Sequence, residues 1–478
     1  MSARVLSGRA ALFLWLLTPA SLLAAAVWPV RAMAQTSAAT EPAAAAPDQP
    51  PTGLMEQDRL TGDWGGVRTR LEDAGVTFGA IATNQVFGNP TGGMRQGVVF
   101  EGNLQLNVTV DLGKAVGWSG AVFHASAYEI YGRGLSSDYI GNLLTVTNVE
   151  ATPSTRLYDL YLEQTLFDGH ASVRVGQFGA DEEFMLSQYG ALFIDSAFGW
   201  PGVPSLDLPG GGGPAYPLAA LGVRVKAQVN DQMTVLAAVF NGNPAGPGTG
   251  DPQARDGSGT LFRLNDGVLV MAEAQYAINQ DKDAAGLPGT YRFGGWYDSE
   301  NFADQRFDTE GLSLANPAST GTPRRHRGDF SLYAIGDQMI WRKPGTKGAG
   351  IGVFARIMGA PGDRNLVNFY ADAGATWKGL IDGRADDTVG FAVGYARISD
   401  AARALDADTG FYRAMAYPIR SNETVLELTY QVQVAPWWQV QPDLQYVFNP
   451  GGGVLNPDRP GQRIGDAVIL GVQTVITF

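Results

Sequence analysis

The chain has 478 residues, of which 17% are charged, and its 34 basic against 47 acidic side chains give a formal net charge of -13. This acidic balance argues against a general nucleic-acid-binding protein. The sequence contains no cysteine, which excludes a disulfide framework and a cysteine-ligated metal site. Length alone fits either one large domain or several smaller ones.

The N-terminus has the pattern of a secretory signal peptide. Two arginines precede the apolar run "ALFLWLLTPASLLAAAVWPV", and the small-x-small cleavage pattern "AMA" follows it. A retained membrane anchor is the alternative, which the Thr-Pro break in the run and the cleavage pattern disfavour. We therefore predict a cleaved signal peptide over residues 1–34 and a flexible Ala/Pro-rich leader over 35–58.

A single clear helical signal, "GDWGGVRTRLEDAG", follows the leader. Asp63 is a candidate N-cap, and Gly75 could end the helix. We predict a short periplasmic helix segment over 59–75, followed by an all-β segment over 76–478. No later stretch approaches the roughly 18 consecutive apolar residues of a membrane-spanning helix.

Segments of alternating apolar and polar residues, bounded by turn residues, predict a 16-stranded antiparallel transmembrane β-barrel. Most of these segments have the roughly 9 to 11 residues that a tilted membrane-crossing strand needs. The predicted strands span residues 76–87, 97–110, 120–131, 155–167, 171–178, 220–229, 233–241, 268–278, 289–298, 329–341, 350–359, 367–377, 388–398, 423–434, 438–448 and 467–478.

The links between these strands alternate in length. Short links such as "FDGH" and "APWW" alternate with long ones, as in an up-and-down barrel with one rim in the periplasm and the other outside. A soluble all-β array has no reason to keep its long loops on one edge. The long links include 132–154, 179–219, 242–267, 299–328 and 399–422.

Two strands near the end of the chain indicate which face meets lipid. In 423–434 and 438–448 one face is mainly apolar and the other carries Glu, Gln and Asp side chains. Sixteen strands make a barrel too wide for side chains to fill, so the polar face must line water and the apolar face, with Leu428, must meet lipid. Aromatic residues at strand ends, such as Trp437, predict interface girdles, and a final Phe478 is typical of outer-membrane barrels.

Four stretches resemble the carbohydrate-selective porins of the OprB family: "LTGDWGGVRTRLEDAGVTFG", "ASVRVGQFGADEEF", "GVFARIMGAPGDR" and "ETVLELTYQVQVAPWWQVQPDLQYVFNPGG". The resemblance runs from about Leu60 to Phe478. It implies a sixteen-stranded outer-membrane porin that passes glucose and other sugars by passive diffusion. Periodicity predicts the barrel, whereas only the resemblance implies the sugar.

Eight polar side chains in the predicted lumen are candidates for contact with sugar, because they offer donors and acceptors for hydroxyl groups. The alternative for each is a solvated wall residue or a member of a salt-bridge network in the wall. The eight candidates are Arg95, Glu101, Asp159, Arg174, Arg224, Arg356, Glu427 and Gln445.

The long link between the fifth and sixth strands could fold inward and narrow the pore. Its Phe198 and Trp200 could offer apolar faces to sugar rings, although packing within the loop is the simpler role. Arg174 and Arg224 flank this link on adjacent strands. We expect the two arginines to form the positive side of a constriction that faces Glu427.

Enzyme hypotheses find little support. The three histidines, His124, His170 and His326, lie far apart in the sequence, and no Gly-x-Ser-x-Gly elbow occurs. "DADTG" resembles the start of a calcium loop but lacks its later ligands, and "PGGGGP" has no Lys-Ser/Thr after it. We predict no enzymatic activity, no cofactor and no metal.

Three function classes remain: a sugar-preferring porin, a general or anion-preferring diffusion porin, and a receptor or adhesin that uses its loops. The resemblance favours the first. It implies the outer membrane of a Gram-negative bacterium as the location. The implied partners are monosaccharides and small oligosaccharides, outer-membrane lipid and the barrel assembly machinery. Association of barrels as a homotrimer stays open.

Overall fold

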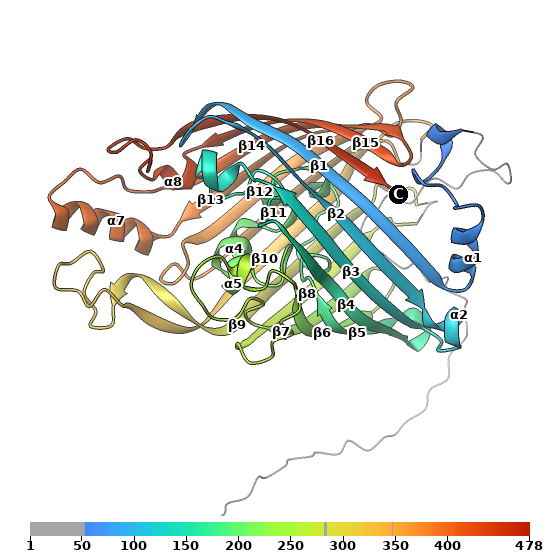
Figure 1. Cartoon of the computed structure of the whole chain (residues 1–478), viewed down its shortest axis with the longest axis horizontal. Coiled ribbons are helices and arrows are strands. Elements are labelled where there is room, and N and C mark those ends of the chain that lie inside the picture. Colours follow the sequence, from blue (N-terminus) through green and yellow to red (C-terminus); the bar gives the residue numbers. More distant parts are fainter. Residues whose placement is uncertain (1–52, 282–283, 347) are drawn as a thin grey trace, which may run out of the picture. The chain divides into compact units, whose positions relative to one another are not determined.

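The computed structural model describes residues 53–281, 284–346 and 348–478. The predicted signal peptide, and the predicted leader up to residue 52, lie outside the described residues. Sixteen antiparallel strands pair in chain order, and the first also pairs with the last, so the barrel is closed (Figure 1). The strands are β1 (Val76–Gly93), β2 (Val98–Asp111), β3 (Ala121–Gly132), β4 (Ser154–Leu166), β5 (Ala171–Phe178), β6 (Ala220–Gln228), β7 (Met233–Asn241), β8 (Val268–Ile278), β9 (Gly289–Asp308), β10 (Pro323–Arg342), β11 (Gly350–Gly359), β12 (Val367–Lys378), β13 (Thr388–Ile398), β14 (Asn422–Ala435), β15 (Trp438–Phe448) and β16 (Gly465–Thr477).

The predicted sixteen-stranded barrel is confirmed, and the largest difference is the hairpin of β9 and β10. Both strands have 20 residues, so most of the predicted link 299–328 is strand. The pairing shifts register between Arg327 and Asp329 and then continues to the pair of Pro323 with Asp308. A bulge of this kind keeps two strands paired while changing their direction. The two-residue alternation is interrupted at a bulge, so the sequence pattern does not predict the part of β9 and β10 beyond it.

Short helices occupy the two rims of the barrel. The rim with the short connections also holds α1, α2 and the last residues of the chain, whereas α7 and α8 lie at the opposite rim (Figure 1). No helix in the described ranges is long and apolar enough to cross a membrane. The helices are η1 (Leu54–Glu56), α1 (Val67–Asp73), α2 (Leu112–Val116), η2 (Ser136–Ile140), η3 (Phe167–Gly169), η4 (Gly190–Leu192), α3 (Ser196–Gly199), α4 (Gly202–Asp207), α5 (Pro209–Gly212), α6 (Pro252–Arg255), α7 (Asp400–Arg413) and α8 (Pro450–Gly453).

The predicted helix near the start of the described chain is α1, and it begins later than Asp63. Gly66 is its N-cap, while the Asp63 carboxylate accepts hydrogen bonds from the backbone N–H and the hydroxyl of Thr69. The longer helix α7 lies in the link 399–422, which we predicted to be a loop. Ser399 caps α7 by accepting a hydrogen bond from the backbone N–H of Ala402.

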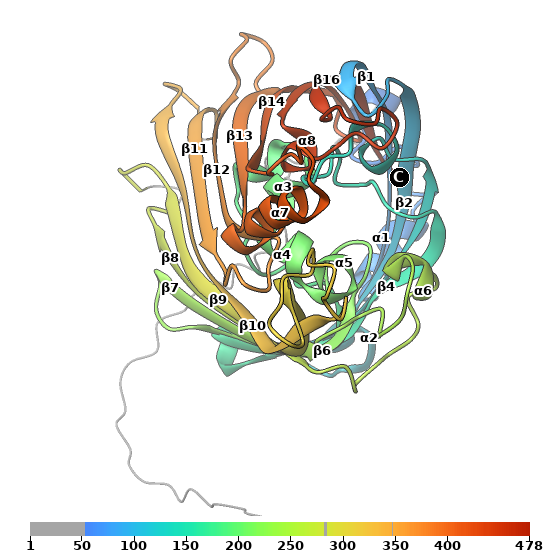
Figure 2. The ribbon, with the colours of Figure 1, turned by 90° about the vertical axis from the view of Figure 1, so that its left-hand side faces the viewer.

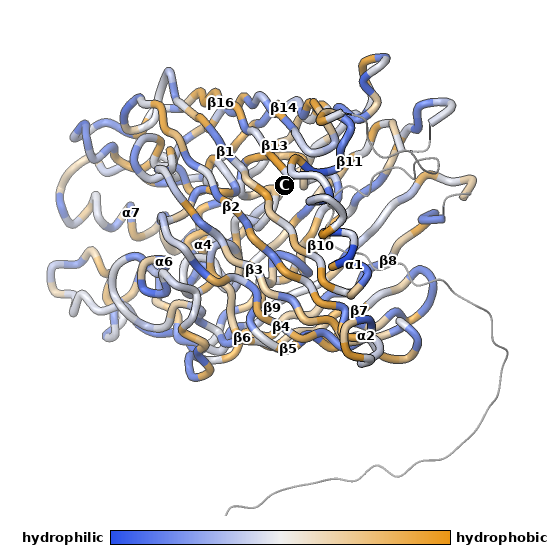
Figure 3. Tube along the Cα trace, turned by 45° about the vertical axis from the view of Figure 1, so that its right-hand side comes forward, coloured by the Kyte–Doolittle hydropathy of each residue, from blue (hydrophilic) through white to orange (hydrophobic). Residues whose placement is uncertain are grey.

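Hydrophilic and hydrophobic residues alternate along the strands (Figure 3), and large apolar side chains are exposed on the outer face, as the alternation predicts. In β14 the side chain of Leu428 is 47% exposed, whereas the neighbouring Glu427 faces inward and is fully buried. Trp437 is an exception to the predicted girdle. It is buried, and its indole N–H donates a hydrogen bond of 2.9 Å to the carbonyl oxygen of Leu54.

The interior of the barrel is partly filled by two inward-folded connections. We name the connection of residues 133–153 L2 and that of residues 179–219 L3. The helices α3, α4 and α5 of L3 lie inside the ring of strands (Figure 2). L3 packs against inward-facing apolar side chains, so this part of the lumen face is a hydrophobic core rather than a water-lined wall. The wall side of this core includes Leu236, Phe240, Met271, Trp296, Tyr333, Phe354, Met358 and Tyr370.

Candidate functional site

Carboxylates of the barrel wall hold L3 by its backbone. Glu427 in β14 accepts hydrogen bonds from the backbone N–H groups of Ile194 and Asp195, at 2.7 and 3.0 Å. Glu273 in β8 accepts one from the N–H of Met185 at 2.9 Å. These donors lie in irregular backbone away from water, where an unpaired N–H is costly. The two glutamates therefore fix the position of L3 across the lumen.

Arg356 in β11 binds the opposite kind of backbone group. Its guanidinium pairs with the Asp372 carboxylate of β12, with an Nε to Oδ2 distance of 2.9 Å. It also donates hydrogen bonds to the carbonyl oxygens of Ala197 and Gly199, at 2.7 and 3.1 Å. Both carbonyl groups belong to α3, a single turn that leaves its carbonyls without partners in the helix. Arg356, which is fully buried, is thus a second anchor of L3.

L2 is held by the predicted candidate Gln445 and by Glu423. The Glu423 carboxylate accepts hydrogen bonds from the N–H groups of Leu143 and Leu144, at 2.8 and 2.7 Å. Gln445 in β15 donates a hydrogen bond of 2.9 Å to the carbonyl oxygen of Val146. Both anchors face inward from neighbouring strands.

The remaining two candidates on the L2 side bind Thr147 and Asp138 of L2. Glu101 in β2 is buried and accepts a hydrogen bond of 2.8 Å from the hydroxyl of Thr147. Arg95 lies in the connection between β1 and β2, where its Nε donates to the carbonyl oxygen of Asp138 at 2.8 Å. Its guanidinium also lies over the ring of Tyr139, 4.9 Å from the centroid.

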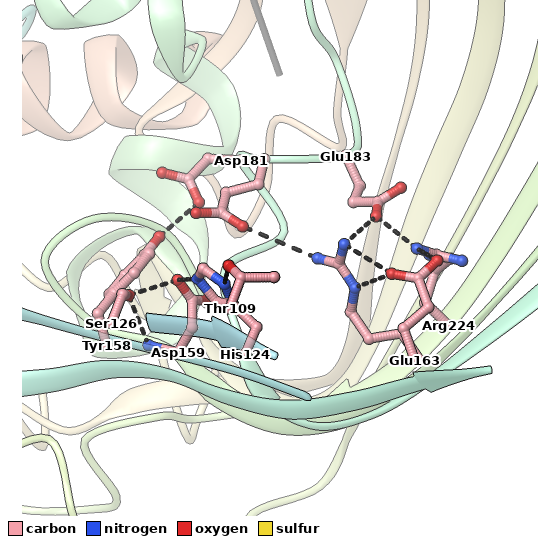
Figure 4. Close-up of polar contacts among 11 residues, drawn as sticks. Thr109, His124, Ser126, Tyr158, Asp159, Glu163, Asp181, Glu183 and Arg224 are labelled. Carbon is pink, nitrogen blue, oxygen red and sulfur yellow. Dashed lines mark hydrogen bonds and ion pairs between the residues drawn. The ribbon is translucent and has the colours of Figure 1, made fainter. Parts of the chain in front are cut away.

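Arg174 and Arg224 contact the start of L3, as expected, through a shared carboxylate cluster (Figure 4). Arg224 Nη2 lies 2.8 Å from Glu163 and 2.7 Å from Glu183, a residue of L3. Arg174 Nη2 lies 3.0 Å from Glu163 and 3.1 Å from Glu183, and its guanidinium lies 4.0 Å from the centre of the Tyr161 ring. Glu427 contacts a later part of L3, so it is not an ion-pair partner of these arginines.

Asp159 belongs to a polar network between β2, β3 and β4 (Figure 4). Its carboxylate accepts a hydrogen bond of 2.6 Å from the Ser126 hydroxyl and lies 3.9 Å from His124 Nε2. His124 Nδ1 is 2.8 Å from the Thr109 hydroxyl. The serine is thus bonded to the carboxylate and the histidine to a threonine, which is not the serine–histidine contact of a hydrolase.

All eight candidates therefore have polar partners in the barrel wall or in the inward-folded connections. The two aromatic residues of L3 also pack within the protein: Phe198 is 1% exposed, and the Trp200 indole N–H donates to the carbonyl oxygen of Gly212 at 2.9 Å. Direct contact of any of the eight with sugar stays a prediction. Six of them are less than 4% exposed, namely Glu101, Asp159, Arg224, Arg356, Glu427 and Gln445.

A cavity of about 340 Å³ remains between L2, L3 and the wall formed by β1 to β4 and β16. Three tyrosines form one side of it. The Tyr128 ring packs edge-on against the rings of Tyr158 and Tyr216, with centroid distances of 5.3 and 5.1 Å. None of the eight candidates lines this cavity. Its lining is Ile81, Thr83, Asn103, Gln105, Tyr128, Asn148, Val149, Tyr158, Asp181, Glu182, Tyr216, Gln473 and Val475.

The polar groups of the cavity fall into two sets. Tyr158 donates a hydrogen bond of 2.7 Å to the Asp181 carboxylate, and Asn103 donates one of 3.2 Å to the Tyr216 hydroxyl. By contrast, four groups have no hydrogen-bond partner within the described ranges, and they can bind a ligand without breaking an existing contact. These are the side-chain amides of Gln105 and Asn148 and the hydroxyls of Thr83 and Tyr128.

Two carboxyl groups of L3 lie at the edge of this cavity. Burial raises the pKa of Asp181. Burial next to Asp159 and Asp181 raises the pKa of Glu182 well above that of an ordinary glutamate. Both groups therefore keep their protons to higher pH than free carboxyl groups do.

Strict alternation hides part of this cavity. It places Tyr158 and Asp159 on opposite faces of β4, yet both side chains are buried inside the barrel. The register between β3 and β4 shifts between Ala125 and Ala127, so two residues of β4 lie opposite Ser126. Such a bulge turns both side chains inward. The amides of Asn103 and Gln105, in contrast, share the inward phase of Glu101 and could have been found from the sequence.

Comparison with known proteins identifies the family. The model of the family described as "Carbohydrate-selective porin, OprB family" matches residues 95–478. The chain belongs to this family. The chain is accordingly a carbohydrate-selective porin, a transport channel of the outer membrane.

Individual relatives span nearly the whole porin. It is 28% identical to Porin B of Pseudomonas aeruginosa over 446 residues, which covers 88% of this chain and 91% of Porin B. It is 25% identical to the putative porin QuiX of Acinetobacter baylyi over 460 residues, which covers 89% and 94% of the two chains. The high-pH structure of Pseudomonas putida OprB superposes with a TM-score of 0.77 at 25% identity, over 89% of this porin and 99% of that chain.

Proposed function

We propose that this porin passes monosaccharides such as glucose by passive diffusion, and that the cavity beside Tyr128 is the narrow part of the passage. The partnerless amides and hydroxyls in that cavity are the observation that carries the proposal. Sugar hydroxyl groups need both donors and acceptors, and side-chain amides and hydroxyls supply both. A volume of about 340 Å³ lies at the low end of the roughly 300–1,000 Å³ of small-molecule sites, which favours one sugar ring at a time.

The charges at the cavity favour neutral sugars over anions. Its lining contains two carboxyl groups, Asp181 and Glu182, and no lysine or arginine among the described residues. A lining of this kind supplies no positive field to concentrate anions. The alternative of an anion-preferring diffusion porin therefore has no support from the cavity.

The eight candidate residues act in this proposal by shaping the passage. Seven of them hold L2 and L3 in place through hydrogen bonds and ion pairs, whereas Asp159 has its partners Ser126 and His124 in the wall. L3 thus covers the wall from β6 to β14 and leaves the wall from β1 to β4 accessible. Among the eight, only Arg174 is proposed to contact a passing sugar. Its guanidinium lies 3.8 Å from the carboxyl group of Glu182, which lines the cavity. The weak contacts of a water-filled lumen suit release as well as entry.

The route to the outer membrane is part of the same proposal. The chain is exported with a signal peptide over residues 1–34 that is then removed, and the mature porin begins with the leader 35–58. The barrel assembly machinery then inserts residues 76–478 into the membrane. A final aromatic residue, Phe478, supports this route because it is typical of such barrels.

Liposome swelling tests the proposed function. Liposomes that contain the folded porin should swell faster in glucose than in an uncharged amino acid of similar size, and slower in a hexuronate than in glucose. Tyr128→Leu should reduce the advantage of glucose. Tyr297→Leu is the matched control, because Tyr297 is 46% exposed on the outer face. Equal swelling rates for all three solutes would contradict sugar selectivity, and an unchanged advantage in Tyr128→Leu would contradict the proposed passage.

A further inference from the structure

The segment that precedes β1 holds the end of the last strand. This segment, residues 54–75, contains η1, α1 and the motif "LTGDWGGVRTRLEDAG". The backbone N–H of Leu60 donates a hydrogen bond of 2.9 Å to the carbonyl oxygen of Thr477. The guanidinium of Arg68 donates two hydrogen bonds of 3.2 Å to the carbonyl oxygen of Phe478. These contacts join positions about 410 residues apart in sequence.

The two contacts lie on opposite edges of the last strand. The N–H of Thr477 donates to the carbonyl oxygen of Trp437, on the side of β15. The N–H of Phe478 donates to the carbonyl oxygen of Ala80, on the side of β1. In an extended strand the N–H and C=O groups of one residue point to the same side. Leu60 therefore binds the strand end at its β15 edge, and Arg68 binds it at its β1 edge.

Arg68 is held rigidly in this position. Arg68 is only 5% exposed. Its guanidinium lies 4.2 Å from the centre of the Trp64 ring, and its Nη2 donates a hydrogen bond of 3.2 Å to the Thr61 hydroxyl. The neighbouring Arg70 lies on the same helix but is exposed, and no side-chain hydrogen bond or ion pair to it is found among the described residues.

Two further contacts connect the segment to itself and to the barrel. Arg59 and Glu72 form an ion pair of 2.8 Å that ties the start of the segment to α1. The indole N–H of Trp437 donates to the carbonyl oxygen of Leu54, which fixes η1 against the turn between β14 and β15. The segment leads directly into β1 and therefore joins three parts of the barrel: β1, the end of β16 and the turn between β14 and β15.

We propose that residues 54–75 form a periplasmic clasp that locks the closed barrel at its seam. The pairing of β1 with β16 joins the two strands that are farthest apart in sequence, so its closure has the largest entropic cost of all the pairings. The clasp is covalently continuous with β1. Once β1 and β16 have paired, the contacts of the clasp with β16 therefore form without a second entropic cost of bringing the two ends of the chain together. Its binding surface is Leu60 and Arg68, and its ligand is the end of β16.

The clasp can form only after β16 has reached β1. Its contacts are therefore absent while the barrel is still open, and interactions formed after the transition state slow unfolding without speeding folding. The clasp is also at the periplasmic rim, whereas L2 and L3 enter the barrel from the opposite rim. Its loss should leave the selectivity of a folded barrel unchanged.

The test compares Arg68→Ala with Arg70→Ala in the full mature porin, refolded in detergent micelles. The rate of heat unfolding, read from the change in gel mobility of the folded barrel, should rise about tenfold in Arg68→Ala, the effect of losing charge-assisted hydrogen bonds of this kind. It should stay at the native value in Arg70→Ala. Folding rates and the glucose swelling rate of folded porin should match the native protein in both. Equal unfolding rates in the two variants would overturn the proposal.

A disulfide provides a second test that does not depend on Arg68→Ala folding. The hydrogen bond between Leu60 and Thr477 brings their Cα atoms to within about 5–6 Å, a distance that a disulfide can span. The native chain has no cysteine, so Leu60→Cys with Thr477→Cys introduces one defined pair. Its oxidation should slow unfolding of the otherwise native porin and restore the native rate in Arg68→Ala. Failure of the pair to oxidise, or no change in unfolding rate on oxidation, would show that the clasp does not hold the seam.

Discussion

Replacement of Glu427 by alanine should release the middle of L3 from the barrel wall. The Glu427 carboxylate binds two backbone N–H groups, those of Ile194 and Asp195, and it is fully buried. Alanine removes both acceptors and leaves two buried donors without partners. The other anchors of L3, which include Glu273 and Arg356, stay intact in this variant, so the expected change is local rather than a loss of the whole fold.

The size of the effect follows from the two lost acceptors. Each buried donor left without a partner costs about 1–3 kcal/mol, so the two together cost about 2–6 kcal/mol. Even the lower value raises the population of a locally released loop about 30-fold. Since L3 occupies most of the lumen beside β6 to β14, release of its middle opens a second path along that wall.

Single-channel recording in a planar bilayer measures this change directly. Glu427→Ala should show a higher mean conductance with frequent transitions between open levels, and liposomes that contain it should lose part of the preference for glucose over an amino acid of similar size. Gln431→Ala is the matched control, because Gln431 faces inward from the same strand and, among the described residues, its side chain makes only a long hydrogen bond of 3.4 Å to Gln441. Native conductance and native noise in folded Glu427→Ala would refute the anchoring role.

Three further predictions follow from the same geometry. Leu428→Arg places a charge on the lipid face at a cost of about 2–4 kcal/mol and should reduce the folded fraction in a gel-mobility assay, whereas Gln431→Arg in the lumen should not. Replacing both Arg174 and Arg224 by alanine leaves their glutamates without cations, so reversal potentials should shift toward cation preference and conductance should rise. Burial raises the pKa of the Asp195 carboxyl well above its ordinary value. Its stabilisation of L3 is therefore complete at pH below the pKa of this carboxyl in the unfolded chain. The stabilisation is lost as pH rises through the pKa of this carboxyl in the folded porin. Channel noise of the native porin should therefore increase as pH rises above the pKa of an unfolded aspartate, and Asp195→Asn should flatten this increase.

The wall of the barrel could be predicted because its chemistry is periodic. Lipid and the lumen impose alternation, and short turns mark the strand ends, so β5, β7, β8, β11, β13 and β15 agree with the predicted ranges residue for residue. Alternation fails where a bulge intervenes, as at Tyr158 in β4, and where paired strands extend past the membrane, as in β9 and β10. It also misses α7, whose acidic and alanine-rich sequence has no two-residue period.

The interior could be predicted less well, since a lumen position does not reveal what it faces. The alternation predicts that Glu427 and Gln445 line a water-filled lumen, yet both are fully buried against L3 and L2. The sequence does contain a sign of this inner layer: apart from Glu273 and Arg356, "LVMAEA" in β8 and "GVFARIMG" in β11 are apolar on both faces. Strands that are apolar on both faces are covered on both sides. This pattern predicts that a connection packs against the inner face of those strands.

The division of the lumen into anchors and free groups decides where sugar passes. The carboxylate of Glu427 could bind a sugar hydroxyl only after breaking its hydrogen bonds with two backbone N–H groups. Leaving those buried donors without partners would cost more free energy than one hydrogen bond to sugar would provide. Among the described residues, the amides of Gln105 and Asn148 and the hydroxyl of Tyr128 have no hydrogen bond that would have to break before they bind sugar. A channel needs contacts that are favourable enough for entry and weak enough for release. In the proposed function only the partnerless groups meet both conditions, and we infer that selectivity for sugar resides in the wall that L3 leaves uncovered.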